Sequence, residues 1–225
     1  MPLTLPEELL LLMLDDRTGR LHEPGGPASA YAIAAAVLSE LALAGRVDTD
    51  PRHLFVADAT PTGDPLLDGV LARIAAADPL PAEDGSVGHH SSRWWIEALG
   101  READTHREAI LARLVARGIL RQEEGRFLWL FAERRYPSIS DREEREVLAR
   151  LTGVIFHDVA PEPRDALLLG LARAAGVLPL ILAPEALDTA APRVDAVANL
   201  EEISRSLGTA VRDIFVEMSR YAPMM

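Results

Sequence analysis

Hydrophobic positions three and four residues apart recur along most of the chain, and this spacing predicts helices. The expected helices cover residues 5–14, 27–45, 64–74, 93–99, 104–117, 141–151, 164–174, 178–183, 193–206 and 209–221. Boundary residues support these limits, because Thr4 and Glu7 match a capping box and Gly45 and Gly118 are placed to end helices. The pattern predicts a mainly α single globular domain over residues 1–225, with a helical-bundle core, surrounding amphipathic helices and one β-hairpin.

One segment departs from the helical period and predicts that hairpin. Residues 119–122 and 127–131 are the expected strands, and the Glu-Glu-Gly sequence at 123–125 is typical of a turn. All five residues of the second strand are apolar, although alternate side chains on a strand point to opposite faces. Either Leu128 and Leu130, or else Phe127, Trp129 and Phe131, therefore need cover from other helices, from a partner subunit or from a membrane interface.

Composition narrows the chemistry that the chain can perform. Acidic residues outnumber basic ones 35 to 23, the net charge is −12, every basic residue is an arginine, and the chain has no cysteine. Without lysine there is no Schiff-base chemistry and no Walker loop, and without cysteine there is no thiol nucleophile, disulfide or thiolate-bound zinc. Arginine keeps its proton, so these bases can bind anions but cannot transfer protons.

Several function classes find little support in the motifs. His89, His90, His106 and Asp84 lack the spacing of metal ligands, so no metal, cofactor or enzymatic activity is expected. The acidic charge argues against nucleic acid, although a helix, Gly118 and a hairpin also match a winged helix, which stays open as a less favoured alternative. The apolar stretch 28–43 is shorter than the roughly 20 residues of a membrane span, so no transmembrane segment and a cytoplasmic location are expected.

Several sequence blocks follow one another in an order that covers most of the chain. They are LTLPEELLL at 3–11 with DRTG at 16–19, LSELALAGRV at 38–47, PTGDPLLD at 61–68, WIE at 95–97 and RLVARGIL at 113–120. This ordered set resembles the Golgi phosphoprotein 3 family of peripheral membrane proteins and its bacterial relatives. The resemblance implies a mainly helical, non-catalytic domain that recognises phosphatidylinositol 4-phosphate at a membrane surface, and a bacterial member is expected.

The resemblance also implies a headgroup pocket made by one tryptophan and three arginines. In this chain the tryptophan position falls at Gly25, and two arginine positions fall at Ala34 and Asp104. Arg107 is retained, and if the helix starts early enough Arg101 lies on the same helical face, where it can partly substitute. The candidate headgroup site is therefore largely altered, and Tyr31 is expected to lie near the same cleft.

Two hypotheses follow for the function. The leading one is a non-enzymatic peripheral membrane or adaptor protein, which meets anionic lipid on the inner face of a membrane and uses Trp129, Leu130 and Phe131 of the hairpin. The alternative is a cytoplasmic scaffold that has lost lipid recognition and forms a homo-oligomer through the same hairpin. Both hypotheses assign the hairpin to an interface.

Overall fold

The computed structural model describes residues 2–15, 18–22, 27–50, 52–77, 80–81, 87–127, 131–139 and 141–200, together with 207, 210, 211, 213 and 214. Its helices are α1 (Leu5–Leu11), α2 (Pro27–Leu43), α3 (Pro65–Ala76), α4 (Ser92–Gly100), α5 (Ala103–Ala116), α6 (Arg142–Phe156), α7 (Pro163–Ala174), α8 (Leu178–Ile181) and α9 (Pro184–Ala198). The mainly α fold class predicted from the hydrophobic period is confirmed.

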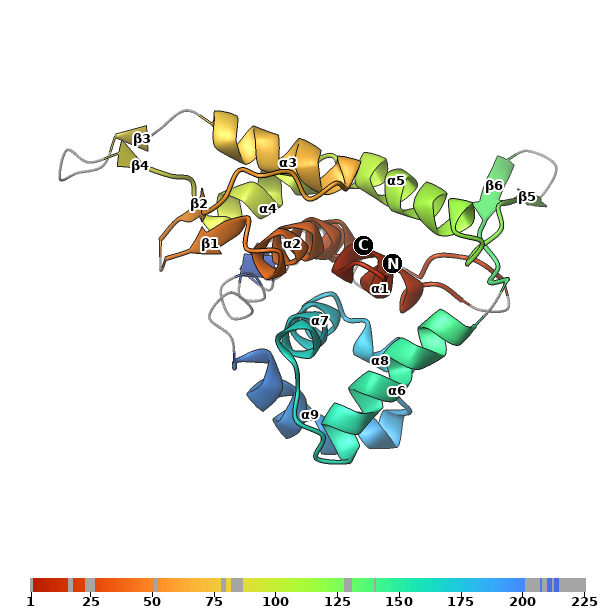
Figure 1. Ribbon diagram of the computed structural model, residues 1–225. Helices are drawn as coiled ribbons and strands as arrows, with labels where there is room; N and C mark the ends of the chain where they lie inside the picture. Colours follow the sequence, from red (N-terminus) through yellow and green to blue (C-terminus); the bar gives the residue numbers. More distant parts are fainter. Residues whose placement is uncertain are drawn as a thin grey trace, which may run out of the picture.

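The helices form three layers, with α1 and α2 in the middle layer (Figure 1). Helices α3, α4 and α5 cover one side of this central pair, and α6, α7, α8 and α9 cover the other side. Helix α2 contacts α1, α4, α5 and α7, so it touches both outer layers. The central position of α2 requires small side chains on several of its faces.

The sequence of α2 suits this position. Pro27 is its first residue, and the run of alanines at 34–36 is fully buried, which lets neighbouring helices approach closely. The helix ends before Gly45, whose φ of +67° is in the left-handed region that favours glycine. Both ends therefore lie where the sequence predicted them.

The strands form three short antiparallel pairs. They are β1 (Val47–Thr49) with β2 (Leu54–Val56), β3 (Leu80–Pro81) with β4 (Val87–Gly88), and β5 (Glu123–Phe127) with β6 (Phe131–Arg135). The first two pairs were not predicted, because strands of two or three residues are too short to show a period. The third is the predicted hairpin, but its predicted strand limits were wrong. Residues 123–125, the expected turn, belong to β5, and Glu123 pairs with Arg135.

Some predicted helix limits also need correction. Helix α1 ends at Leu11, and Leu14 forms a single β-bridge with Leu21. Helix α4 begins at Ser92, one residue before the predicted start, and its cap is Ser91, whose hydroxyl accepts a hydrogen bond from the Trp94 N–H. Helix α9 begins nine residues before the predicted start at 193, and Pro192 lies inside the helix.

Helix α1 is buried along its whole length, including two glutamates. The relative exposure of Glu7 is 0% and that of Glu8 is 3%. The expected capping box is present, with the Thr4 N–H donating to the Glu7 carboxylate at 2.8 Å. Two adjacent buried carboxylates require compensating charges from the helices around them.

Arginines from three other helices provide this compensation. Arg113 and Arg117 of α5 pair with Glu7, and Arg150 of α6 and Arg164 of α7 pair with Glu8. Three further carboxylates complete the group, which we call the α1 charge network: Glu40, Asp64 and Asp165. Glu40 also accepts the Leu5 N–H at 2.6 Å, and Asp64 caps the start of α3.

The network joins α1 to helices of both outer layers. Burial raises the pKa of Glu8 above its ordinary value, although the charges of Arg150 and Arg164 act in the opposite direction. The ion pairs therefore offset a desolvation cost, and their main effect is to fix which helices meet at α1. Removal of one arginine would leave Glu7 or Glu8 with a single partner for a buried carboxylate.

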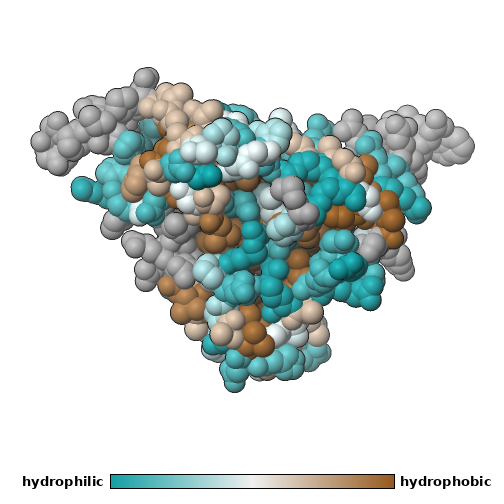
Figure 2. Space-filling model, viewed as in Figure 1, coloured by the Kyte–Doolittle hydropathy of each residue, from teal (hydrophilic) through white to brown (hydrophobic). Residues whose placement is uncertain are grey.

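The surface seen in Figure 2 is predominantly hydrophilic. Apolar atoms on this face occur as separate small patches among polar ones. Larger exposed apolar side chains of the described residues include Trp94 on α4, Ile139 after β6, Leu180 on α8 and Leu200 after α9. They lie on different elements, so each exposed side chain has to be considered in its own surroundings.

We expect Arg150→Met to lower the free energy of unfolding by about 3–5 kcal/mol, because Glu8 and Asp165 lose a shared partner while they stay buried. Urea denaturation measures this change. The control is Arg145→Met on the same helix, where an exposed ion pair with Asp141 contributes less than about 1 kcal/mol. Equal losses in the two variants would show that the α1 charge network does not carry this stability.

Candidate functional site

The candidate site lies where α4 passes into α5 beside the first turns of α2. Arg101 and Glu102 connect the two helices, and Tyr31 of α2 lies against the last residue of α4, Gly100. A Cβ atom at Gly100 would be 2.5 Å from the Tyr31 ring, so only glycine permits this close approach. The contact brings α2 to the junction that carries Arg101.

The two candidate arginines differ in their surroundings. The side chain of Arg107 is 25% exposed, and its guanidinium pairs with the Asp104 carboxylate one turn earlier on α5. The Asp104 side chain is 88% exposed, so the carboxylate is at the surface in the first turn of the helix. Arg101 is exposed, and within the described part of the chain no acidic side chain pairs with it.

The other candidate headgroup residues make no surface contribution that the structure describes. Ala34 is fully buried in α2. Gly25 lies outside the described residues. The structure places Tyr31 against Gly100 and pairs Asp104 with Arg107. Helix α5 begins at Ala103, so Arg101 does not lie on the helix that carries Arg107, and Ala34 lies in the core.

This arrangement has a definite electrostatic consequence. Arginine guanidinium groups suit phosphate because they can donate two parallel hydrogen bonds. Here the Arg107 guanidinium already pairs with the Asp104 carboxylate. A second acid, Glu102, pairs with Arg73 of α3 at 2.8 Å. An incoming anion would compete with Asp104 for Arg107 and would meet Arg101 without such competition.

The hairpin residues can be placed only in part. Phe127 and Phe131 are opposite each other in the last pair of β5 and β6. Trp129 and Leu130 lie outside the described residues. The apolar run 127–131 thus begins on one strand and ends on the other, so it does not form one strand with two apolar faces as the sequence analysis expected.

An aromatic cluster near the start of α4 was not recognised in the sequence. His90 stacks on Trp94, with ring centroids 3.6 Å apart and an interplanar angle of 12°. Trp95 meets Trp94 edge-on at 4.9 Å. Adjacent histidines and adjacent tryptophans were visible in the sequence, but their contact depends on how the extended residue Ser91 joins His90 to the start of α4.

The histidines considered as metal ligands differ in their surroundings and in their burial. His90 belongs to the aromatic cluster, and His106 is buried in α5, where burial lowers its pKa below the ordinary value of 6.5. Asp84 lies outside the described residues. Among the described side chains, no group of three or more His, Asp or Glu residues could hold a metal ion.

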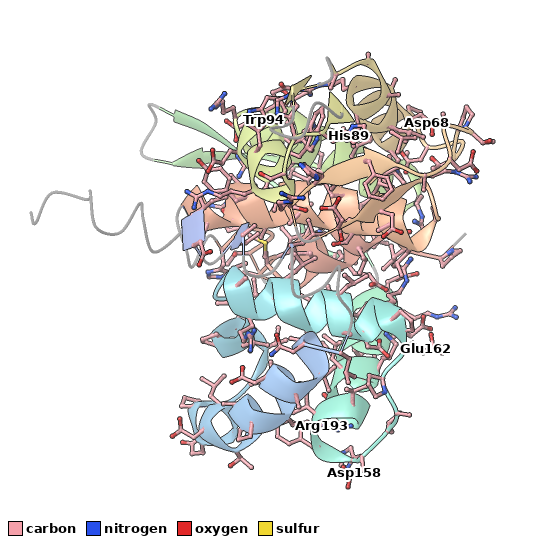
Figure 3. All side chains as sticks on the ribbon, turned by 90° about the vertical axis from the view of Figure 1, so that its left-hand side faces the viewer. Asp68, His89, Trp94, Asp158, Glu162 and Arg193 are labelled. Carbon is pink, nitrogen blue, oxygen red and sulfur yellow. The ribbon has the colours of Figure 1, made fainter. Side chains whose placement is uncertain are left out.

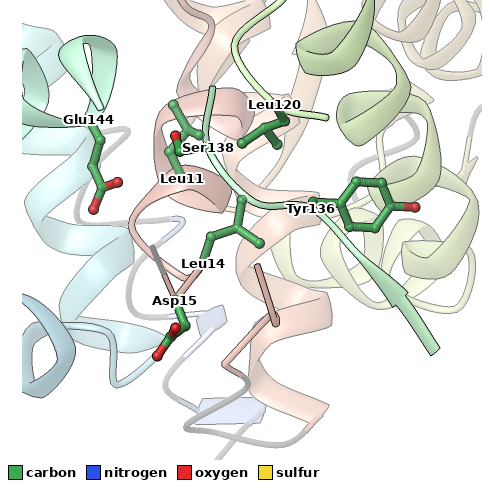
Figure 4. A pocket seen from close by; sticks show the side chains of 7 residues that line it. All are labelled: Leu11, Leu14, Asp15, Leu120, Tyr136, Ser138 and Glu144. Atoms are coloured by element: carbon green, nitrogen blue, oxygen red, sulfur yellow. The ribbon is translucent and has the colours of Figure 1, made fainter. Parts of the chain in front are cut away.

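Two of the cavities lined by described residues lie away from this site. The first, between the end of α1, the segment after β6 and α6, is too small for a water molecule (Figure 4). Its Asp15 accepts hydrogen bonds from Thr18, which lower the pKa of Asp15 to about 2. The second has a volume of about 350 Å³ and lies between α7, α8 and α9, with a mostly apolar lining beside the ion pair of Arg173 and Asp195.

The features described so far define a class of protein: a helical domain built around a buried charged helix, with an arginine-bearing helix junction and a projecting hairpin. None of the described helices has both the length and the hydropathy that a bilayer-crossing helix needs. The family model of Golgi phosphoprotein 3 (GPP34) matches residues 5–218. The chain therefore belongs to the Golgi phosphoprotein 3 family, and the resemblance found in the sequence is confirmed.

Two relatives carry the same description, vacuolar protein sorting-associated protein 74. The one from Eremothecium gossypii is 31% identical over 159 residues, which are 66% of this chain and 47% of the relative. The one from Schizosaccharomyces pombe is 31% identical over 175 residues, which are 71% of this chain and 51% of the relative. The chain thus spans about half the length of the curated relatives it matches.

We expect Gly100→Ala to lower the free energy of unfolding by about 1–3 kcal/mol, because the added methyl group would overlap the Tyr31 ring. Gly69→Ala in α3 is the matched control. Its methyl group meets no atom within 4 Å, so helix propensity should stabilise the protein by about 0.5–1 kcal/mol. Thermal or urea unfolding measures both, and a stabilising Gly100→Ala would contradict the close packing at the junction.

Proposed function

We propose that the protein is a non-enzymatic peripheral membrane adaptor of the Golgi phosphoprotein 3 type. The observation that carries the proposal is the family match over residues 5–218, which includes the junction of α4 and α5 as well as the hairpin. The description of the two relatives as vacuolar protein sorting-associated proteins supports a role in protein sorting. The membrane would be met from its cytoplasmic side.

The lipid preference of this chain should differ from that of family members with a complete arginine pocket. Asp104 holds Arg107 and places a negative charge at the surface of the same helix turn. Each basic residue near an anionic lipid surface strengthens the binding free energy by about 1 kcal/mol, and an acidic residue at the same place weakens it. The proposed adaptor therefore binds anionic lipid weakly through Arg101 and Arg107 and gains little from a phosphoinositide headgroup.

The hairpin provides the second part of the proposed contact. Its apolar run includes Trp129, and tryptophan is favoured at membrane interfaces because one edge of the ring is polar. An apolar contact is insensitive to salt and does not depend on the net charge of −12. This contact explains how an acidic protein could still bind a membrane.

Co-sedimentation with phosphatidylcholine and phosphatidylglycerol vesicles, with and without phosphatidylinositol 4-phosphate, tests the proposal. We expect the wild type to pellet with the vesicles, Trp129→Ala to pellet less, and the phosphoinositide to change binding less than about twofold, since a factor of two is under 0.5 kcal/mol. Asp104→Asn should strengthen binding to anionic vesicles about fivefold, because one negative charge is removed beside Arg107.

Asp141→Asn is the matched control, because Asp141 is also an exposed acid paired with an arginine near the start of a helix. It should leave vesicle binding unchanged. A wild type that pellets with no vesicle would refute the membrane function. Equal effects of Asp104→Asn and Asp141→Asn would refute the assignment of the lipid contact to the junction.

A further inference from the structure

Helix α4 buries one of two adjacent tryptophans and exposes the other. Trp95 is 3% exposed and packs with Ile96 and Leu99 in the core, whereas Trp94 is 43% exposed. An exposed indole has a large apolar area, and burying such a side chain stabilises a complex substantially. A surface that covers the Trp94 ring would therefore gain this apolar burial.

The exposed ring is held in one orientation. His90 covers one face of the Trp94 ring at 3.6 Å between centroids, and Trp95 contacts it edge-on at an interplanar angle of 87°. The backbone of Trp94 is fixed as well, because its N–H donates to the Ser91 hydroxyl at the helix cap. Little side-chain entropy remains to be lost when a partner covers the ring.

A positive charge follows on the same stripe of the helix. Arg101 comes seven residues after Trp94, which is two helical turns or about 10 Å along the axis. Glu97 lies between them, and Arg93 pairs with Glu97 at 2.8 Å. The exposed stripe thus carries an aromatic ring at one end, a compensated acid in the middle and an arginine at the other end.

This stripe and the hairpin both lie towards the left of Figure 3, although Figure 1 shows α4 and the hairpin well apart along the molecule. In Figure 3 the β5–β6 hairpin projects to the left, and Trp94 lies in the left half of the view, whereas Asp68 lies on the right. An indole ring and an arginine separated by about 10 Å suit the chemistry of a phospholipid surface, where the ring sits among the headgroups and the guanidinium pairs with a phosphate. A flat surface can meet the stripe and the hairpin together.

We propose that Trp94 is a second membrane contact of this protein, which inserts at the level of the lipid headgroups while Arg101 binds a lipid phosphate. The inference rests on the proposed membrane function and defines which face of the domain the membrane covers. It adds α4 to the hairpin as a point of attachment. Two separated contacts fix the orientation of the domain on the membrane.

Quenching by brominated phosphatidylcholine in vesicles that also contain phosphatidylglycerol tests this contact. Trp129→Phe retains Trp94 and Trp95, and Trp94→Phe combined with Trp129→Phe retains Trp95 alone. We expect brominated vesicles to quench the fluorescence of the first variant and to leave that of the second unchanged, since Trp95 is buried. Equal quenching of the two variants would overturn the assignment of the contact to Trp94.

Vesicle binding gives an independent readout. Trp94→Ala should weaken binding to the same vesicles about tenfold, whereas Leu180→Ala, which shortens another exposed apolar side chain on α8, should have no effect. If the wild type pellets and Trp94→Ala binds equally well, the second contact is refuted and the proposed function stands. If the wild type pellets with no vesicle, the proposed function and the second contact both fail.

Discussion

Two adjacent glutamates on a fully buried helix impose the constraint on which the rest of this structure depends. Glu7 and Glu8 cannot remain charged in the core without partners, so α5, α6 and α7 each contribute arginines that reach α1. The need to satisfy both carboxylates determines how the helices of the two outer layers are placed on the central pair. Apolar packing alone would tolerate several arrangements of these helices, whereas the paired charges select one.

Several residues of the α1 charge network come from the sequence blocks that resemble the family. The block at 3–11 supplies Glu7 and Glu8, the block at 38–47 supplies Glu40, and the blocks at 61–68 and 113–120 supply Asp64, Arg113 and Arg117. These blocks therefore contain part of the α1 charge network, whereas Arg150, Arg164 and Asp165 lie outside them. The junction between α4 and α5 lies outside this network, so a substitution at Arg101 or Asp104 removes none of the ion pairs that hold α1.

Sequence reasoning succeeded where local chemistry decides the structure. Pro65 after Asp64 and Gly118 after α5 marked helix limits that the structure confirms. The hairpin limits were wrong because a Glu-Glu-Gly turn pattern outweighed a pairing that places Phe127 opposite Phe131. At the site, the pairing of Asp104 with Arg107 follows from their spacing on one helix. The contact of Tyr31 with Gly100 and the stacking of His90 on Trp94 depend on tertiary structure, so no local pattern predicts them.

The central claim is that the charged contacts of α1 are specific couplings that hold the layers together. A double-mutant cycle on Glu7 and Arg117, with Glu7→Gln, Arg117→Met and the combined variant, measures one of these couplings by urea denaturation. The account predicts a coupling free energy of about 1–3 kcal/mol, because the pair joins a fully buried carboxylate to a partly buried guanidinium 3.1 Å away. Additive losses, with a coupling below about 0.5 kcal/mol, would contradict it.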